Sequence, residues 1–269
     1  MRYIVIGAIF IFMVSAAPSF GHTRPPLTGE VSLDIVTDSN STFQSFSHQD
    51  LWRGQTRIIK KYLEAKKGEN YIIVIRNNSP ERIGVVIAVD GRNIISGNRS
   101  DLKNSEAMYI VNPYEHARYH GWRTTDNEVN RFYFTDPADS YSIRTFADSS
   151  AMGVIAVAVY REKERSQPMY ERKDGETAPA APSIDGAARS KRKTLADESA
   201  GTGFGDARYS PVVRVAFEPE RAPVQKMLVK YEWRETLCRK GIIQCGQDRK
   251  NRLWDQDGYA PYPPGYPRS

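Results

Sequence analysis

Between residues 31 and 160, short apolar runs alternate with polar turn residues along the chain. The runs are rich in Val, Ile, Tyr and Phe, which favour β-strands, and the connections between them are of modest length. This pattern predicts strands at residues 31–36, 58–64, 71–77, 83–89, 93–96, 108–111, 117–122, 129–135 and 152–160. Such spacing indicates an all-β fold, an antiparallel β-sandwich of jelly-roll-like or immunoglobulin-like form, over residues 22–160.

Three details of this pattern bear on strand pairing. Asp90-Gly91 separates two apolar runs and predicts a two-residue hairpin turn, which needs a positive φ at both positions. The stretch 51–63 also matches one face of a helix, but the charged turn at residues 66–70 that follows it favours a strand. The run 152–160 is almost continuously apolar, which is typical of a central strand covered on both faces.

Beyond residue 160 the pattern changes. Residues 161–203 are rich in Pro, Ala, Ser and mixed charges and contain almost no large apolar residue. This composition predicts a disordered linker, because too little apolar surface can be buried to offset the loss of conformational entropy on folding. A glycine-rich stretch at 201–205 ends the linker and is interpreted as a flexible junction. Apolar and polar residues alternate again at residues 213–217 and 227–233, and this pattern predicts a β-hairpin within a basic segment at 204–248. Residues 249–269 form a Tyr/Pro-rich tail that we expect to be extended.

The N-terminus is typical of a signal peptide at residues 1–21. Arg2 precedes an apolar run that ends at Val14, and small residues follow. The run is shorter than the roughly 20 residues that a membrane span needs, so we expect cleavage before His22 and a soluble protein without a transmembrane segment. The predicted location is periplasmic or extracellular, where Cys238 and Cys245 can form a disulfide.

The net charge of +6 is unevenly distributed. Residues 22–160 carry 16 Lys or Arg and 16 Asp or Glu, whereas residues 204–269 carry 12 and 8. A protein that binds nucleic acid usually has a basic face on its folded domain, and the predicted sandwich is neutral. The charge therefore favours an envelope protein or an acidic surface, bound through residues 204–269, over nucleic acid.

Side chains that support catalysis or metal binding are sparse in this sequence. His116 and His120 have the spacing of a zinc pair on a helix, but their segment matches a strand or loop, and they are interpreted as surface histidines. The oxygen-rich stretches at 34–41 and 136–148 lack EF-hand spacing, and turn chemistry explains them. The sequence contains no nucleophile elbow, Walker loop or dinucleotide fingerprint after a strand. We therefore expect a non-enzymatic protein without catalytic residues, metal or cofactor.

Four motifs in the first half of the chain resemble a known family. They are VDGRNIISG at 89–97, GWR at 121–123, FYFTDPADSY at 132–141 and GVIAVAV at 153–159. In this order and spacing they resemble a family of uncharacterised exported bacterial proteins with one β-rich domain, over roughly residues 70–163. The resemblance implies a β-rich fold and export, and it implies no activity and no site residue.

These observations predict an exported binding or scaffold protein of the bacterial envelope or the extracellular space. The residues expected to contact a partner are Tyr231, Trp233, Arg234, Arg239, Tyr259, Tyr262 and Tyr266, because exposed aromatic residues and Arg are favoured interface anchors. For Tyr231 and Trp233, packing in the core is the alternative. One alternative function is carbohydrate binding on aromatic platforms built from Trp52, Tyr114, Tyr119 and Trp122, and another is an exported hydrolase with an unrecognised site.

Overall fold

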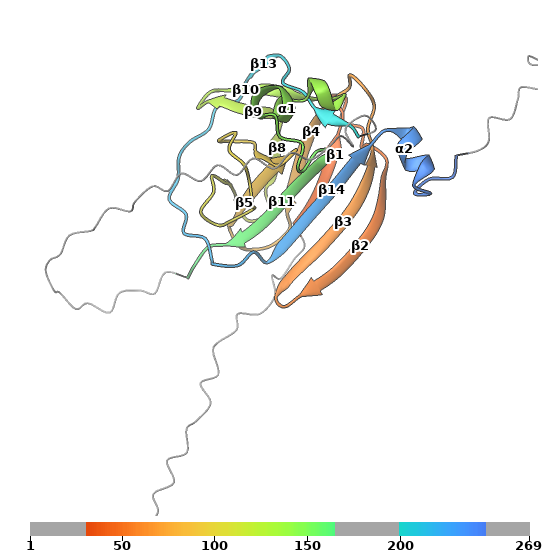
Figure 1. Cartoon of the computed structure of the whole chain (residues 1–269). Coiled ribbons are helices and arrows are strands. Elements are labelled where there is room, and N and C mark those ends of the chain that lie inside the picture. Colours follow the sequence, from red (N-terminus) through yellow and green to blue (C-terminus); the bar gives the residue numbers. More distant parts are fainter. Residues whose placement is uncertain (1–30, 165–198, 246–269) are drawn as a thin grey trace, which may run out of the picture.

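Fourteen strands and two short α-helices are formed by the described residues of the computed structural model, which are 31–164 and 199–245 (Figure 1). The strands form two mixed or antiparallel sheets that face each other across an apolar core. The predicted all-β sandwich is therefore confirmed. The expected signal peptide at 1–21, most of the expected linker and the expected tail at 249–269 lie outside the described residues.

The first sheet has the order β1-β4-β10-β12, with β8 on β4 and both β9 and β13 on β10. All of its pairings are antiparallel. Its strands are β1 (Val31–Val36), β4 (Asn70–Asn77), β8 (His116–Tyr119), β9 (Gly121–Thr125), β10 (Glu128–Thr135), β12 (Gly201–Thr202) and β13 (Ala207–Tyr209).

The second sheet has the order β2-β3-β14-β11-β5-β6, with β7 on β5. Its strands are β2 (Ser45–Arg53), β3 (Thr56–Glu64), β5 (Ile83–Val89), β6 (Arg92–Asn93), β7 (Tyr109–Val111), β11 (Val154–Arg161) and β14 (Gln225–Glu232). The pairing of β14 with β3 is parallel, and the other pairings in this sheet are antiparallel.

Aromatic side chains fill the space between the sheets. Tyr71 of β4 stacks on Phe132 and Phe134 of β10, with ring centroids 5.2 and 4.4 Å apart. Trp122 of β9 meets Phe132 edge-on, and Tyr231 of β14 reaches Phe134 at 5.2 Å from the opposite sheet. All five rings are buried, so the two sheets share one core.

Most of the predicted strands have the expected positions. β1 and β5 have the predicted bounds, and β11 is a central strand between β14 and β5, buried on both faces from Val157 to Arg161. The predicted strand at 117–122 divides into β8 and β9, and the strand at 93–96 is reduced to β6. The ambiguous stretch 51–63 belongs to the antiparallel strands β2 and β3, so the helical alternative is wrong.

The predicted turn at Asp90-Gly91 is confirmed. Val89 pairs with Arg92 across the turn, and the φ angles of Asp90 and Gly91 are 48° and 77°. Both central residues therefore have the positive φ that this hairpin requires.

The C-terminal hairpin predicted within 204–248 is not formed. β14 covers most of the expected strand at 227–233, but it lies between β3 and β11 in the middle of the second sheet (Figure 1). The expected partner strand at 213–217 is outside any strand, and Val213 and Val215 are 87% and 55% exposed. The alternation identified β14 correctly, but its pairing with β3 and β11 buries Met227, Val229 and Tyr231, whereas an isolated two-stranded hairpin is only marginally stable in water.

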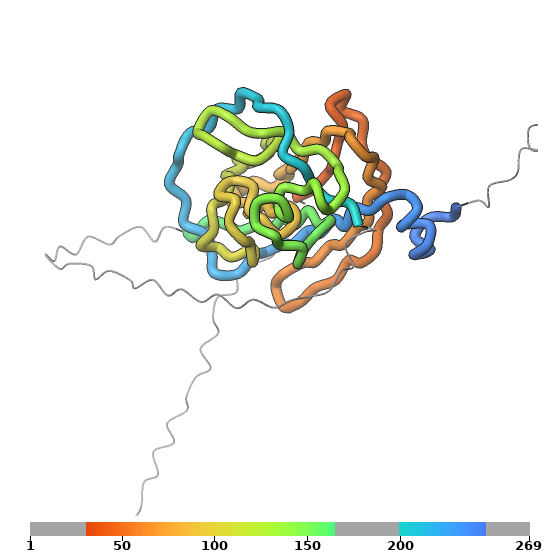
Figure 2. The backbone as a smooth tube through the Cα atoms, turned by 45° about the horizontal axis from the view of Figure 1, so that its top comes forward, coloured from red at the N-terminus to blue at the C-terminus, as the bar shows by residue number. Residues whose placement is uncertain are grey.

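The boundaries of the linker also need correction. Arg161 belongs to β11 and is 2% exposed, and residues 200–203 are buried. The segment after residue 199 (cyan in Figure 2) crosses beside the 3₁₀-helix η1 (Pro137–Asp139) and the helix α1 (Tyr141–Phe146). The glycine-rich stretch at 201–205 is therefore an ordered part of the fold and not a flexible junction.

A close approach between backbones explains the glycines in this segment. A Cβ atom on Gly203 would overlap the ring of Tyr133, and one on Gly201 would lie 2.8 Å from the Cβ of Ser140. The missing side chains let β12 pair with β10. None of the described helices is long and apolar enough to cross a membrane.

Candidate functional site

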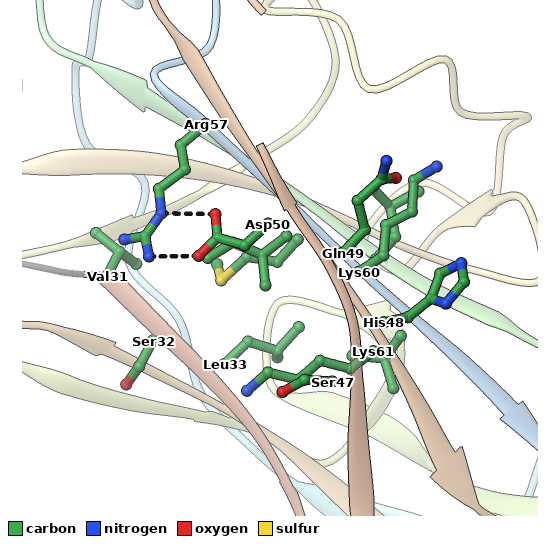
Figure 3. Close-up of a pocket in the computed structure, with 14 residues that line it drawn as sticks. Val31, Ser32, Leu33, Ser47, His48, Gln49, Asp50, Arg57, Lys60 and Lys61 are labelled. Atoms are coloured by element: carbon green, nitrogen blue, oxygen red, sulfur yellow. Dashed lines mark hydrogen bonds and ion pairs between the residues drawn. The ribbon is translucent and has the colours of Figure 1, made fainter. Parts of the chain in front are cut away.

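β1 and β2 are the edge strands of the two sheets. Residues 37–44 connect them, and at this corner the Phe43 amide donates to the Ile35 carbonyl and the Glu64 amide donates to the Gln44 carbonyl, both at 3.0 Å. Further along, the two edges leave between them a cavity of about 320 Å³, called the edge cavity below (Figure 3). This volume is at the lower end of the range for small-molecule sites.

The inner wall of the edge cavity is apolar. It is formed by Val31 and Leu33 of β1, Ile59 of β3, and Met227 and Val229 of β14. The Nε2 of Gln225, at the start of β14, donates to the Val31 carbonyl at 2.9 Å and ties the first sheet to the second beside the cavity.

Strand alternation adds polar groups to this apolar wall. In the β2–β3 hairpin, Ser47 is opposite Lys61 and Asp50 is opposite Ile59, so these side chains share the face that is turned toward β1. The next pair, Gln49 and Lys60, has the opposite orientation and points away from β1, as Figure 3 shows. The two neighbouring lysines of β3 therefore have different surroundings.

The charges that line the edge cavity do not cancel. Arg57 donates to Asp50 through Nε at 3.1 Å and through Nη2 at 2.7 Å, and hydrogen bonding with Arg57 lowers the pKa of this carboxyl group (Figure 3). Lys61 is half-buried and makes no ion pair within residues 31–164 and 199–245. The cavity thus combines apolar walls, a neutral ion pair and the ammonium groups of Lys60 and Lys61, which make no ion pair within the described residues; of the two, Lys61 is on the face turned toward β1.

Sequence reasoning missed this site. Its signal was the pair Lys60-Lys61 inside the otherwise apolar run of strand 58–64. One of two adjacent lysines in a strand must face inward, because successive side chains point to opposite faces. The position of β1 over that face depends on the tertiary structure.

The predicted contact residue Tyr231 is a core residue. It is 0% exposed, and its hydroxyl group donates to Oδ1 of Asp90 at 2.5 Å. Trp233 is half-buried and packs against the same core. The alternative of core packing therefore holds for Tyr231, which is not available to a partner.

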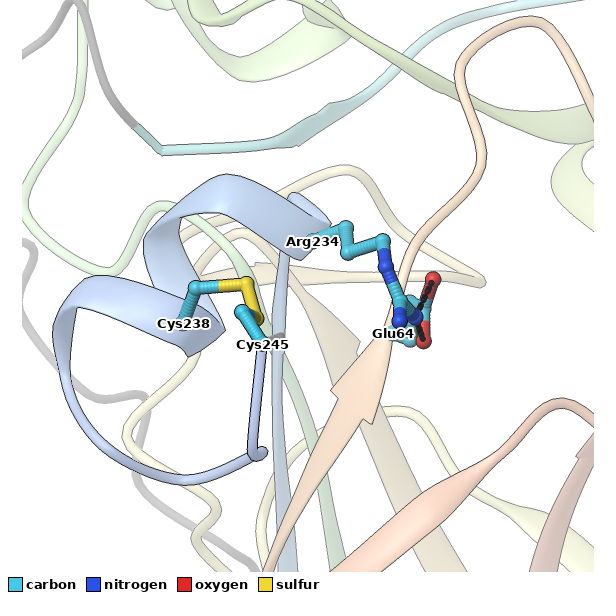
Figure 4. Close-up of a disulfide and its surroundings, with 4 residues drawn as sticks. All are labelled: Glu64, Arg234, Cys238 and Cys245. Carbon is cyan, nitrogen blue, oxygen red and sulfur yellow. Dashed lines mark hydrogen bonds and ion pairs between the residues drawn. A yellow bond between two sulfur atoms is a disulfide. The ribbon is translucent and has the colours of Figure 1, made fainter. Parts of the chain in front are cut away.

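The remaining predicted contact residues are divided between α2 (Arg234–Arg239) and the tail. Arg234 donates from Nη1 to both carboxylate oxygens of Glu64 at 3.1 and 3.0 Å (Figure 4), and Arg239 donates to Thr236 at 3.3 Å. Tyr259, Tyr262 and Tyr266 lie outside the described residues. Contact with an envelope partner through residues 204–269 stays a prediction.

The disulfide predicted between Cys238 and Cys245 is confirmed. Their Cα atoms are 5.4 Å apart, and the bridge closes the turn that follows α2 (Figure 4). Lys240, in the same turn, donates to the buried carboxylate of Glu232 at 2.5 Å. The bridge therefore fixes the local turn that follows α2.

The four aromatic residues considered for carbohydrate binding do not form one platform. Trp122 and Tyr119 are buried at 2% and 8% exposure, and the Trp122 indole donates to the Gly203 carbonyl at 3.0 Å. Trp52 and Tyr114 are exposed, but one lies on β2 and the other precedes β8 on the first sheet.

His116 and His120 do not form the zinc pair that a helix would have given. His116 is on β8 and His120 follows it, so an extended backbone separates them. Among the described residues, no group of three or more His, Cys, Asp or Glu is placed to hold a metal ion.

The strongest concentration of buried polar groups surrounds Asp90. Its carboxylate accepts hydrogen bonds from the Tyr231 hydroxyl, from the Gly153 amide at 2.7 Å and from the Thr202 amide at 2.8 Å. The Thr202 hydroxyl in turn contacts the hydroxyls of Tyr231 and Tyr71 at 2.7 and 2.8 Å. Burial raises the pKa of Asp90 to about 6, although these hydrogen bonds favour the ionised form. The group is 1% exposed, so this network joins the two sheets and does not receive a ligand.

Comparison with family models, with curated proteins and with solved structures gives no match. The candidate site therefore rests on its own geometry, and the family resemblance of the four motifs stays a prediction.

Proposed function

We propose that the chain is an exported, non-enzymatic binding protein whose ligand occupies the edge cavity between β1 and the β2–β3 hairpin. The observation that carries the proposal is the half-buried residue Lys61, which lines the cavity beside the apolar wall and makes no ion pair within the described residues. A charge near apolar surface costs free energy unless a counter-charge is present. A bound anion would supply that counter-charge.

The lining of the cavity indicates the class of ligand. The walls from β1 and β14 favour an apolar body, and Lys61 favours a single negative group at one end. A small monocarboxylate with an aliphatic or aromatic body matches both features. We therefore propose a ligand of this class, such as a medium-chain fatty acid.

The state of Asp50 supports binding rather than catalysis at this position. Its two oxygens accept from Arg57, and that contact lowers its pKa. A carboxylate that is held ionised in this way is a poor proton donor near neutral pH. Its role in the proposal is to keep Arg57 in place at the rim.

Export is supported by the N-terminal sequence pattern and by the cysteine bridge, which persists in oxidising compartments. Cell fractionation followed by mass spectrometry of the intact protein tests it. The expected result is a protein that begins at His22 in the exported fraction, and full-length protein in the cytosol would contradict the proposal.

Ligand binding is tested with octanoate on the full chain, by chemical-shift perturbation in two-dimensional NMR spectra. We expect saturable shifts in β1, β3 and β14, and binding at least about tenfold weaker for Lys61→Met, since one lost ion pair near apolar surface corresponds to 1–2 kcal/mol. Lys226→Met is the matched control, because Lys226 is a half-buried lysine of β14 that does not line the cavity.

Octanol and octylamine separate the role of charge from that of the apolar body. Both should bind more weakly than octanoate. The absence of saturable shifts for all three probes would overturn the proposed function, as would an equal loss of octanoate binding in Lys226→Met and Lys61→Met.

A further inference from the structure

Three arginines gather on the outer face of the first sheet. Arg118 is on β8 opposite Val74 of β4, and Val74 belongs to an apolar cluster separate from the main core. Arg131 precedes the core residue Phe132 on β10 and so has the outward orientation. Arg208, on β13, is opposite Val129 of β10. Val129 and Arg131 are two positions apart, so the side chains of Arg131 and Arg208 are on the same face. We call these three residues the arginine cluster.

The loop between β1 and β2 supplies the polar partners of this cluster. Asp38 forms an ion pair with Arg131 and accepts from Nδ2 of Asn70 at 3.2 Å. The Nη1 of Arg118 donates to the side-chain oxygen of Asn40 at 2.8 Å, which is a neutral partner.

The arginine cluster keeps an excess of positive charge. Arg208 is exposed, and its side chain makes no ion pair or hydrogen bond within the described part of the chain. Burial alone would raise the pKa of Asp38, but its carboxylate is paired with Arg131 and is close enough to Arg208 for the charge of that residue to lower the pKa as well.

The excess of positive charge also affects the protonation of His120. Its carbonyl accepts from the Phe132 amide at 3.1 Å, and its half-buried ring lies among the cluster. Burial, followed by the charges of Arg208, Arg118 and Arg131, lowers the pKa of His120 to about 4, and Asp38 only partly opposes this effect. Its Nδ1 is buried and has no hydrogen-bond partner among the described residues.

We propose that the arginine cluster binds a phosphate group. Guanidinium groups donate paired hydrogen bonds to phosphate oxygens, and three of them from neighbouring strands can serve the several oxygens of one tetrahedral anion. A carboxylate offers only two oxygens and would leave part of the cluster unused. This site is on the opposite side of the first sheet from the edge cavity and is independent of the function proposed there.

The first test uses inorganic phosphate and the full chain. Phosphate stays a monoanion through the acidic range in which His120 titrates, and its binding should raise the pKa of His120, measured from the imidazole NMR signals. Arg208→Ala should weaken phosphate binding at least fivefold, measured by the same titration. Arg214→Ala is the matched control, because Arg214 is an exposed arginine of the same segment that pairs with Asp126.

The second test identifies the source of the phosphate group. Vesicles of phosphatidylglycerol are compared with vesicles of phosphatidylcholine by co-sedimentation at neutral pH. Saturable binding of inorganic phosphate that depends on Arg208 supports a free anion, and Arg208-dependent binding to phosphatidylglycerol alone supports a lipid headgroup. A response to neither probe, an equal response of Arg208→Ala and Arg214→Ala, or equal binding of acetate would overturn the proposal. Lys61→Met should leave both readouts unchanged, so failure here is distinguishable from failure at the edge cavity.

Discussion

The buried carboxyl group of Asp90 should give the protein a distinctive dependence of stability on pH. Its pKa is raised from 3.8 to about 6 in the folded protein, because burial outweighs the three hydrogen bonds that it accepts. In the unfolded chain the group returns to its ordinary value. Between these two values the folded protein holds more protons than the unfolded chain, so the free energy of unfolding falls as pH rises.

The magnitude follows from the difference in pKa. The rise in pKa from 3.8 to about 6 corresponds to about 3 kcal/mol of stability, which is fully present below the unfolded pKa and lost once pH has risen through the folded pKa. Most of the loss should occur between about pH 4 and 6. Asp38 and Asp148 have lowered pKa values and change the stability in the opposite direction. The contribution of Asp90 must therefore be isolated with a variant.

Urea unfolding of the protein and of Asp90→Asn at several pH values measures the contribution of Asp90 to the free energy of unfolding. The variant has no titrating group at position 90, so its stability relative to the natural protein should improve by about 2 kcal/mol as pH rises from 4 to 7. Asp139→Asn, at an exposed position in η1, is the control and should show no such trend. A relative stability of Asp90→Asn that stays constant or changes in the other direction would refute the reasoning.

Three further predictions test the structure of the C-terminal half. Gly203→Ala should lower the free energy of unfolding by about 2–4 kcal/mol by urea denaturation, because its Cβ would overlap the Tyr133 ring; an unchanged value would contradict the close approach. Residues 1–164 and 199–269, co-expressed as two chains, should co-purify through a tag on one of them, since β14 pairs with both β3 and β11, and separate elution would argue against this insertion. Cys238→Ser should lower the free energy of unfolding by at most about 2–3 kcal/mol, seen as a lower melting temperature, and the amides of β14 should stay protected from hydrogen exchange. Loss of that protection would show that the bridge stabilises more than the turn.

The sequence determined the class of fold and the positions of most strands. Apolar runs bounded by turn residues located β1, β4, β5, β10 and β11, because burial and side-chain alternation are encoded within each strand. Asp90-Gly91 specified its own turn, since its requirement for positive φ is local. The spacing of Cys238 and Cys245 likewise indicated a bridge that closes within one turn.

The tertiary structure alone decided which strands became neighbours. Alternation in β14 was visible, but its parallel pairing with β3 brings together residues far apart in the chain, and no local pattern encodes such a partner. The same reason explains the glycine-rich stretch at 201–205, whose role depends on the Tyr133 ring beneath it.

Both candidate sites belong to this second category. The sequence contained Lys61 and the three arginines, but a charged residue in a strand pattern is usually only a solvated side chain. The edge cavity needed β1 of one sheet to lie over β3 of the other, and the arginine cluster needed β8, β10 and β13 to become neighbours. Local sequence sets the face on which a side chain lies, whereas the pairing of distant strands sets what it meets there.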